Sequence, residues 1–221
     1  MRLEPIQELT PRQAEISARI TARRGGTRGP FLVWLRSPEL CERVESLGAY
    51  CRFESALSPR LRELSLLIAA RHFDAQYSWN AHVDKAVDTG VSREGLERLA
   101  RREDPRFPAA DDQLLYQFAT EVLERHFVSD ETFAAGLAAF GEQGLVDLIG
   151  CLGNFSMLAM LLNTFQVDLQ ASRPAPFPDI RGYVKIDSDS DSEVEAAPDA
   201  DAASEAGRKP ELVGGQWPER P

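Results

Sequence analysis

One histidine in the sequence stands among polar and aromatic side chains that could form a reactive site. In the stretch FDAQYSWNAHVDKAVDTG (residues 73–90), His82 follows Ser78 by four positions and Ala75 by seven. On a helix these three positions share one face, because residues three, four and seven apart lie above one another. Imidazole titrates near neutrality, so a histidine beside a hydroxyl and a carboxylate has the minimal equipment for proton transfer.

A carboxylate for this histidine would come from Glu63, in the preceding segment. A turn near His72 could fold that segment back against the stretch, or the two could run on as one long helix. Taken alone, the pattern favours a structural histidine over a catalytic one. Tyr77 and Trp79 fit core or subunit contacts as well as substrate contacts, and Ser78 could bond its own backbone.

Other residues of chemical interest give weaker signals. The remaining histidines, His72 and His126, have no ligand-type partners at useful spacing, so we expect no metal site. The glycine-containing stretch RGGTRGP does not follow a strand and is no phosphate loop, and we expect no cofactor. Asn154 and Ser156 interrupt an apolar helix, where they either line a pocket or, as we favour, form a buried hydrogen bond between helices.

The elements that must position these residues are helical. Proline follows a capping residue at Thr10, Ser37 and Ser58, the arrangement typical of a helix start. Ser92 is expected to cap a short helix that ends before Pro105, and Ser129 or Asp130 a further one. The apolar run LVDLIGCLGNFSMLAMLLNTF (residues 145–165) predicts a central core helix. No segment alternates with the period of a strand, so we predict an all-α domain over residues 1–170.

Composition limits the class of protein. The formal charge of -10 argues against wrapping nucleic acid, since that needs clustered lysine and arginine. The polar and glycine residues within 145–162 argue against a membrane span. The start of the chain has no apolar signal segment, and three cysteines without C-x-x-C spacing suit a reducing compartment. We therefore expect a soluble, cytoplasmic protein.

The composition changes near residue 170. Residues 171–221 carry 11 acidic and 6 basic side chains, a net charge of -5, and few apolar groups. Such a segment gains too little from burial to offset the entropy lost on ordering, so we expect a largely disordered acidic tail. Its first part, RPAPFPDIRGY, could lie extended along the domain. The alternating serine and aspartate around Ser188–Ser192 could accept phosphate groups, although a solvated spacer is the simpler interpretation.

The stretch SPRLRELSLLIAARHFDAQYSWNAHVDKAVDTGVS resembles the signature helices of the carboxymuconolactone decarboxylase / alkylhydroperoxidase D-like superfamily. Members often read R-E-x-x-I/L-x-x-A, then Y-E-W-x-x-H or a C-x-Y/H-C-x-x-x-H segment, then a helix ended by glycine. Gly29-Pro30-Phe31, the Ser37–Leu40 opening and the last apolar helix also fit the decarboxylase-like branch. The resemblance covers roughly residues 27–168 and implies an all-helical homo-oligomer, a trimer or a hexamer.

Matched position by position, Glu63 corresponds to the acid of this signature and His82 to its terminal histidine. The redox cysteines of the peroxidase branch would fall at Ala75 and Ser78, so the thiolate that reduces peroxide is missing. Ser78 also stands where the decarboxylase-like branch often has glutamate, which puts a direct copy of the decarboxylase in doubt.

We therefore expect a cofactor-independent enzyme that uses acid/base proton transfer on a small carbonyl or carboxylate compound. His82 and Glu63 would be the catalytic residues, with Tyr77, Ser78 and Trp79 shaping the substrate pocket. The alternative is a non-catalytic helical scaffold or small-molecule binding module. A thiol peroxidase is a second alternative, which would require Cys41 and Cys51 to be adjacent and reactive.

Overall fold

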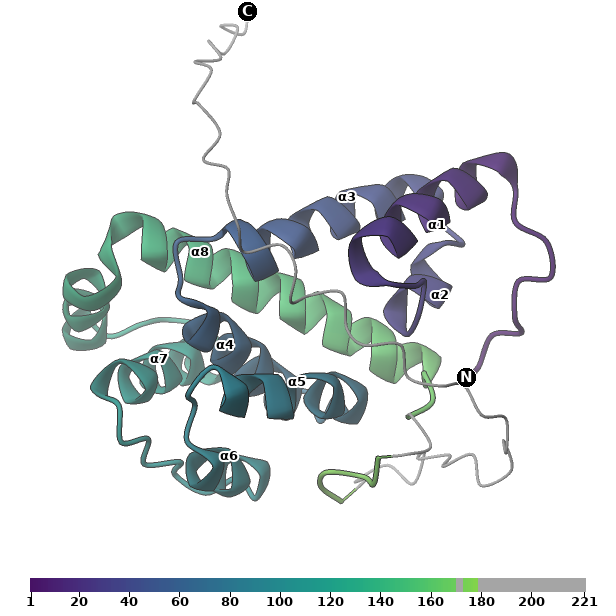
Figure 1. Cartoon of the computed structure of the whole chain (residues 1–221). Coiled ribbons are helices and arrows are strands. Elements are labelled where there is room, and N and C mark those ends of the chain that lie inside the picture. Colours follow the sequence, from purple (N-terminus) through teal and green to yellow (C-terminus); the bar gives the residue numbers. More distant parts are fainter. Residues whose placement is uncertain (170–172, 179–221) are drawn as a thin grey trace, which may run out of the picture.

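Helices are the regular secondary structure throughout the part of the chain that the computed structural model describes, residues 1–169 and 173–178. The all-α prediction is confirmed for these residues. In chain order (Figure 1) the elements are α1 (Pro11–Arg24), α2 (Pro30–Trp34), α3 (Pro38–Ala49), the π-helical η1 (Tyr50–Glu54), α4 (Pro59–His72), α5 (Gln76–Asp88), α6 (Arg93–Ala100), α7 (Ala110–Thr120), the π-helical η2 (Glu121–Arg125) and α8 (Asp130–Phe165).

Short sequence signals set most of the helix boundaries. Thr10 and Gln13 form a reciprocal capping box at the start of α1, and Gly25 ends that helix with a φ of 72°. Side-chain oxygens also cap three later helices, at Ser58, Ser92 and Ser129. Ser37 precedes α3 as predicted but makes no capping hydrogen bond through its side chain. The π-helical segments and the short helix α2 were not predicted.

The long helix α8 crosses the molecule and is interrupted once. Gly141 has φ 71° and ψ 174°, values outside the helical region, which agrees with the sequence prediction of two successive helices here. By length and composition α8 would be able to cross a membrane, but half of its most apolar window is buried inside the fold. The core helix of a soluble protein passes the same test.

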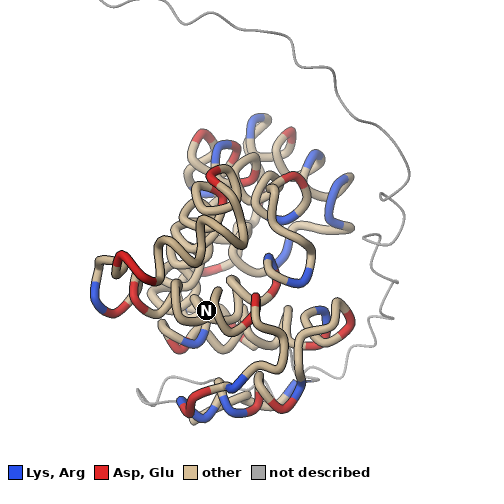
Figure 2. The backbone as a smooth tube through the Cα atoms, turned by 90° about the vertical axis from the view of Figure 1, so that its left-hand side faces the viewer, with Lys and Arg blue, Asp and Glu red and all other residues tan. Residues whose placement is uncertain are grey.

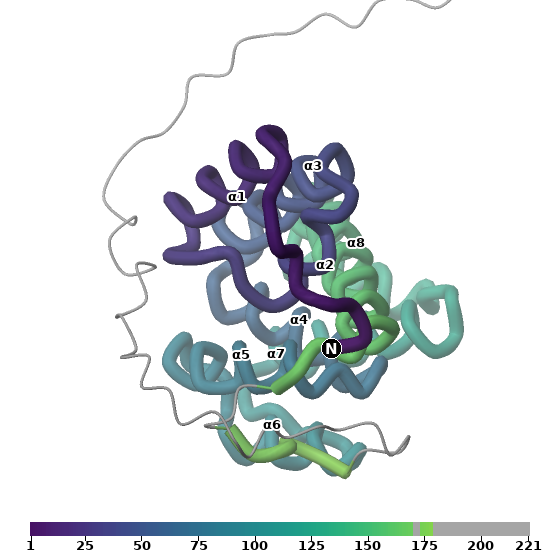
Figure 3. Tube along the Cα trace, turned by 90° about the vertical axis from the view of Figure 1, so that its right-hand side faces the viewer, coloured from purple at the N-terminus to yellow at the C-terminus, as the bar shows by residue number. Residues whose placement is uncertain are grey.

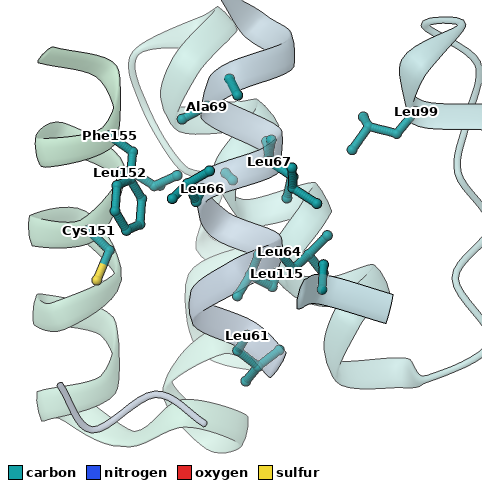
Figure 4. Packing of buried hydrophobic residues seen from close by; sticks show 14 of the residues in the cluster. Leu61, Leu64, Leu66, Leu67, Ala69, Leu99, Leu115, Cys151, Leu152 and Phe155 are labelled. Atoms are coloured by element: carbon teal, nitrogen blue, oxygen red, sulfur yellow. The ribbon is translucent and has the colours of Figure 1, made fainter. Parts of the chain in front are cut away.

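The main hydrophobic core forms where α4 packs between α8 and α7 (Figure 4). Leu64 and Leu67 of α4 are fully buried, and Cys151, Leu152 and Phe155 approach them from α8. A second core cluster holds α1, α2 and α3 together through residues that include Ile16, Ile20, Trp34 and Cys41. Two helical layers thus meet along α8, and α4 and α5 lie next to their junction.

The two ends of the described chain lie close to α8 and α5. The terminal ammonium of Met1 bonds Asp168 at 2.7 Å, which brings the N-terminus beside the end of α8 (Figure 3). Acidic and basic residues both occur around the backbone trace (Figure 2), although α7 and α8 carry acidic residues and no lysine or arginine.

Residues 173–178, at the start of the segment that was expected to be largely disordered, pack against the helical domain. Asn80 donates to the carbonyl of Pro174 at 2.9 Å, Gln76 donates to that of Phe177 at 2.6 Å, and the Phe177 ring is buried. The expected extended path of RPAPFPDIRGY is therefore seen for its first part. The acidic stretch around Ser188–Ser192 lies outside the described residues.

Candidate active site

A sharp turn folds α5 back against α4. Helix α4 ends at His72, and residues 73–75 connect it to α5, with Asp74 in the left-handed conformation at φ 53°. Arg71 and Arg102 both pair with the Asp74 carboxylate and hold the turn. Of the two arrangements that the sequence left open, the folded-back one is observed. Helix α5 begins at Gln76, so Ala75, which was expected on the same helical face as Ser78 and His82, precedes the first turn of that helix.

This turn brings Glu63 of α4 against His82 of α5. The Nδ1 of His82 lies 2.7 Å from Oε2 of Glu63, and the two side chains are 15% and 16% exposed. The 19-residue separation spans the turn, so the contact depends on the packing of the two helices. The pair has the geometry of a base whose orientation is fixed by a carboxylate.

Burial and charge together set the protonation of this pair. Burial lowers the pKa of His82, and nearby Arg52 and Lys85 act in the same direction, while Glu63 opposes them. Burial would raise the pKa of Glu63, but His82 and these two cations keep it below its usual value. At neutral pH the pair is therefore a carboxylate and a neutral imidazole, with Nδ1–H donating to Glu63 and Nε2 left as a base.

His82 lines a cavity of about 410 Å³, within the range of small-molecule sites. Tyr77 and Ser78 of α5 line the same cavity, as the sequence analysis expected. The Ser78 Oγ is buried and has no hydrogen-bond partner among the described residues. A buried hydroxyl usually has a partner, so this oxygen is suited to contact a bound molecule.

Trp79 is placed differently from our expectation and does not line this cavity. Its side chain is buried and packs edge-on against Phe177, with ring centroids 5.7 Å apart. The guanidinium carbon of Arg71 lies over the Phe177 ring, 4.3 Å from its centroid. Successive side chains on a helix point about 100° apart, so Trp79 and Ser78 contact different neighbours. Trp79 anchors the 173–178 segment.

Tyr77 lies against the loop before α2. A Cβ atom at Gly29 would come within 2.4 Å of the Tyr77 hydroxyl oxygen, so only glycine allows this approach. Gly29 also has a φ of 55°, a value that residues with a side chain rarely adopt. Burial raises the pKa of Tyr77, so its hydroxyl stays protonated at neutral pH and can donate a hydrogen bond.

Several lining residues come from helices that the sequence analysis did not connect with His82. Arg24 comes from α1, Gly48 from α3 and Asn154 from α8. The oxygen Oδ1 of Asn154 is buried without a hydrogen-bond partner in the described part of the chain, so the hydrogen bond between helices that we favoured is not seen. The interruption of an apolar helix by asparagine was the signal that pointed to this residue.

The cysteines lie away from the cavity. All three are buried, with Cys41 in the second core cluster and Cys51 in the main core. The Sγ of Cys151 lies 3.7 Å from the carbonyl oxygen of Cys51. The juxtaposition of Cys41 and Cys51 that a thiol peroxidase would require is therefore not observed. Within residues 1–169 and 173–178, no cluster of three or more His, Cys, Asp or Glu side chains could hold a metal ion.

Comparison with known proteins supports the fold. No protein-family model and no curated protein matches the sequence. Among solved structures, a protein of unknown function from Agrobacterium tumefaciens, described as a candidate antioxidant defence protein AhpD, superposes with a TM-score of 0.55 and 19% identity. That match covers 62% of this chain and 95% of the other. An uncharacterised peroxidase-related protein from Silicibacter sp. TM1040 superposes with a TM-score of 0.63 and 15% identity, over 77% and 91% of the two chains.

At these identities the two structures show that the chain shares their all-helical fold, which is the fold that the sequence resemblance implied.

Proposed function

We propose that this chain, which has the AhpD-like fold, is a cofactor-independent enzyme that transfers a proton on a small carbonyl compound. The observation that carries the proposal is the 2.7 Å contact between His82 and Glu63 at the wall of a cavity of about 410 Å³. A neutral, oriented imidazole at a sheltered cavity is the arrangement that general-base catalysis needs.

In the proposed step, Nε2 of His82 removes a proton from the carbon next to the substrate carbonyl. The electron pair of the broken C–H bond moves toward the carbonyl oxygen, so that the substrate becomes an enolate. Glu63 accepts the hydrogen bond from Nδ1–H and stabilises the imidazolium that forms. Tyr77 and Ser78 supply hydroxyl donors for oxygen atoms of the substrate. Return of the proton to another carbon gives isomerisation, and loss of a leaving group with its bonding electrons from the neighbouring carbon gives elimination. A decarboxylation would follow a different step, in which the C–C bond to a carboxylate breaks, CO₂ leaves, and the resulting enolate takes a proton from the protonated form of His82.

Deuterium exchange tests the proposal without knowledge of the natural substrate. The full chain is incubated in D₂O with acetone, 4-oxopentanoate or methyl 4-oxopentanoate, and NMR follows the loss of protons next to the carbonyl. We expect exchange above the buffer rate, reduced about a hundred-fold or more in His82→Gln. The proposal is wrong if the wild-type protein and His82→Gln exchange all three compounds at the same rate.

A non-catalytic binding module is the second candidate, because the unpartnered oxygens of Ser78 and Asn154 in the cavity would serve a binder equally well. The exchange experiment separates the two candidates. A binder would retain ligands in the His82→Gln variant and show no exchange in either protein.

We also propose a homo-oligomer, supported by apolar side chains of α8 that remain exposed in one copy of the chain. Val146 is 71% exposed, and Ile149 and Met160 are about half exposed. Exposed apolar residues on one helix are typical of an interface between subunits. Light scattering measures the mass of the wild-type chain and of the Val146→Glu variant. We expect the mass of an oligomer for the wild type and the mass of a single chain for the variant. A single-chain mass for the wild type would contradict it.

A further inference from the structure

The cavity beside His82 lies where the two hydrophobic cores of the protein meet. Trp34 and Val44 line it from the second core cluster, and Leu66 and Phe155 line it from the main core. These four side chains come from four different helices and are between 3% and 6% exposed. Leu66 and Phe155 lie between α4 and α8 (Figure 4). The four residues form an apolar wall that is shielded from solvent.

The α5 side of the same cavity runs from buried to exposed residues. Ser78 is 4% exposed, the His82 side chain is 15% exposed and the Asp84 side chain is 51% exposed. Asp88, one turn beyond Asp84, is also exposed. A helix rises about 1.5 Å per residue, so this side of the cavity climbs about 9 Å from Ser78 to Asp84. His82 therefore stands between a sheltered interior and a charged mouth.

Two guanidinium groups of the lining are engaged with aromatic rings of the protein. The guanidinium carbon of Arg24 lies 5.2 Å from the centroid of Phe31, and that of Arg52 lies 4.9 Å from the centroid of Phe53. At the mouth, Arg173 pairs with the carboxylate of Asp84 at 2.7 Å. We therefore assign none of these three cations to a ligand.

Burial of a ligand group against the apolar wall favours an uncharged hydrocarbon. Apolar groups gain free energy when they leave water, whereas a charged group loses its hydration and finds no compensating partner among such side chains. The cavity volume of about 410 Å³ lies in the range of pockets that enclose most of the surface of a drug-sized ligand. An alkyl chain or a phenyl ring can therefore accompany the carbonyl group.

We propose that the cavity selects a ketone with an uncharged alkyl or aryl substituent, which lies against the apolar wall while the carbonyl group lies beside His82. Only the placement of the carbonyl rests on the proposed function, because the apolar wall would bind the substituent whether or not a proton is transferred. Contact along the substituent would hold the carbonyl and its neighbouring C–H bond at the imidazole.

A series of ketones tests the selectivity. NMR titration of the full chain in H₂O measures the dissociation constants of acetone, butan-2-one, pentan-2-one and hexan-2-one. We expect the affinity to rise about four-fold with each methylene, the gain for complete burial of a CH₂ group. Equal affinities for the four ketones would overturn the inference.

Two further probes separate apolar contact from size. 4-Methoxybutan-2-one has the length of hexan-2-one with one methylene replaced by oxygen, and 4-oxopentanoate carries a carboxylate in place of the end of the chain. Both should bind more weakly than hexan-2-one, because each brings a polar group to the apolar wall. The inference is wrong if either of them binds as tightly as hexan-2-one.

Val44→Thr makes one position of the apolar wall polar with little change in volume. We expect hexan-2-one to bind about three-fold or more weakly in this variant, with little change for acetone. The matched control is Val91→Thr, because Val91 is 2% exposed in the main core and does not line the cavity. An equal loss in both variants would refute the role of the wall. If Val44→Thr does not fold, Val44→Ile fills part of the cavity instead, and hexan-2-one should then bind no more tightly than pentan-2-one.

His82→Gln distinguishes a failure of this inference from a failure of the proposed function. If this variant keeps the rise in affinity along the series while deuterium exchange is absent even in the wild type, the selectivity stands and the proton-transfer function fails. If exchange depends on His82 but the ketones bind with equal affinity, the function stands and the selectivity fails.

Discussion

The imidazole of His82 and the carboxylate of Glu63 meet at 2.7 Å across two helices, although 19 residues separate them in the chain. The turn at residues 73–75 makes this contact possible, and burial keeps the histidine neutral. A neutral base held by a carboxylate has consequences for activity, pH dependence and stability that can be measured.

Replacing Glu63 by glutamine should slow proton transfer while keeping the histidine in place. A glutamine amide can still accept a hydrogen bond from Nδ1–H, but it no longer stabilises the imidazolium. We expect deuterium exchange about ten- to a thousand-fold slower. The double variant Glu63→Gln/His82→Gln should be no slower than His82→Gln alone, because the two residues act as one unit. If the fold-reduction in exchange rate of the double variant equals the product of the two single reductions, the two residues act independently.

The pH dependence of exchange should follow the protonation of His82. Its pKa lies below the usual 6.5, chiefly through burial, so the base stays available as the pH falls through 6.5 and is lost only at lower pH. Lys85→Gln removes a nearby cation that lowers this pKa, so the acidic limb should move to higher pH. NMR titration of the His82 ring measures the same pKa independently. An acidic limb above pH 6.5 in the wild type would contradict the assignment.

The same depressed pKa should make the protein less stable at mildly acidic pH. Below about pH 6.5 the unfolded chain binds a proton at His82 that the folded chain does not. As the pH is lowered, the free energy of unfolding therefore decreases, until the pH reaches the lower pKa that His82 has in the folded chain. His72, whose pKa is also lowered by burial, contributes with the same sign. Urea unfolding from pH 7.5 to 5 should therefore show a smaller loss in His82→Gln than in the wild type. Equal losses would indicate that His82 is not buried in its neutral form.

Gly29→Ala should destabilise the fold more than Gly25→Ala. Both glycines have positive φ, which costs a residue with a side chain about 1–2 kcal/mol. An added carbon at Gly25 meets nothing within 4 Å, whereas at Gly29 it would clash with the Tyr77 hydroxyl. Denaturant unfolding of both variants measures the difference, and Tyr77→Ala should relieve the extra cost in Gly29→Ala. Equal losses of stability in the two glycine variants would contradict the close approach of Tyr77.

Phe177→Ala should release the 173–178 segment from α5. The phenyl ring is buried against Trp79 and Arg71, and its removal leaves the Gln76 and Asn80 hydrogen bonds without an apolar anchor. We expect faster proteolysis near residue 173 and altered tryptophan fluorescence. Ala175→Ser, at an exposed position of the same segment, is the control and should behave as the wild type. Unchanged proteolysis of Phe177→Ala would show that the ring is not the anchor.

The sequence by itself determined the helical class, most helix starts and the residues of the central pair. Capping and helix periodicity act between residues at most a few positions apart, so they can be read along the chain, as at Thr10, Ser58 and Ser92. The spacing within the resemblance then identified Glu63 and His82 as candidates.

Only the tertiary structure decided which residues surround that pair. Periodicity fixes the relative faces of a helix but not which neighbour each face meets, so Trp79 was expected in the pocket and instead binds the 173–178 segment. Arg24, Gly48 and Asn154 come from three helices, and their convergence depends on long-range packing around α8. Burial, which sets the pKa of His82, is likewise a property of the assembled fold rather than of any local stretch of sequence.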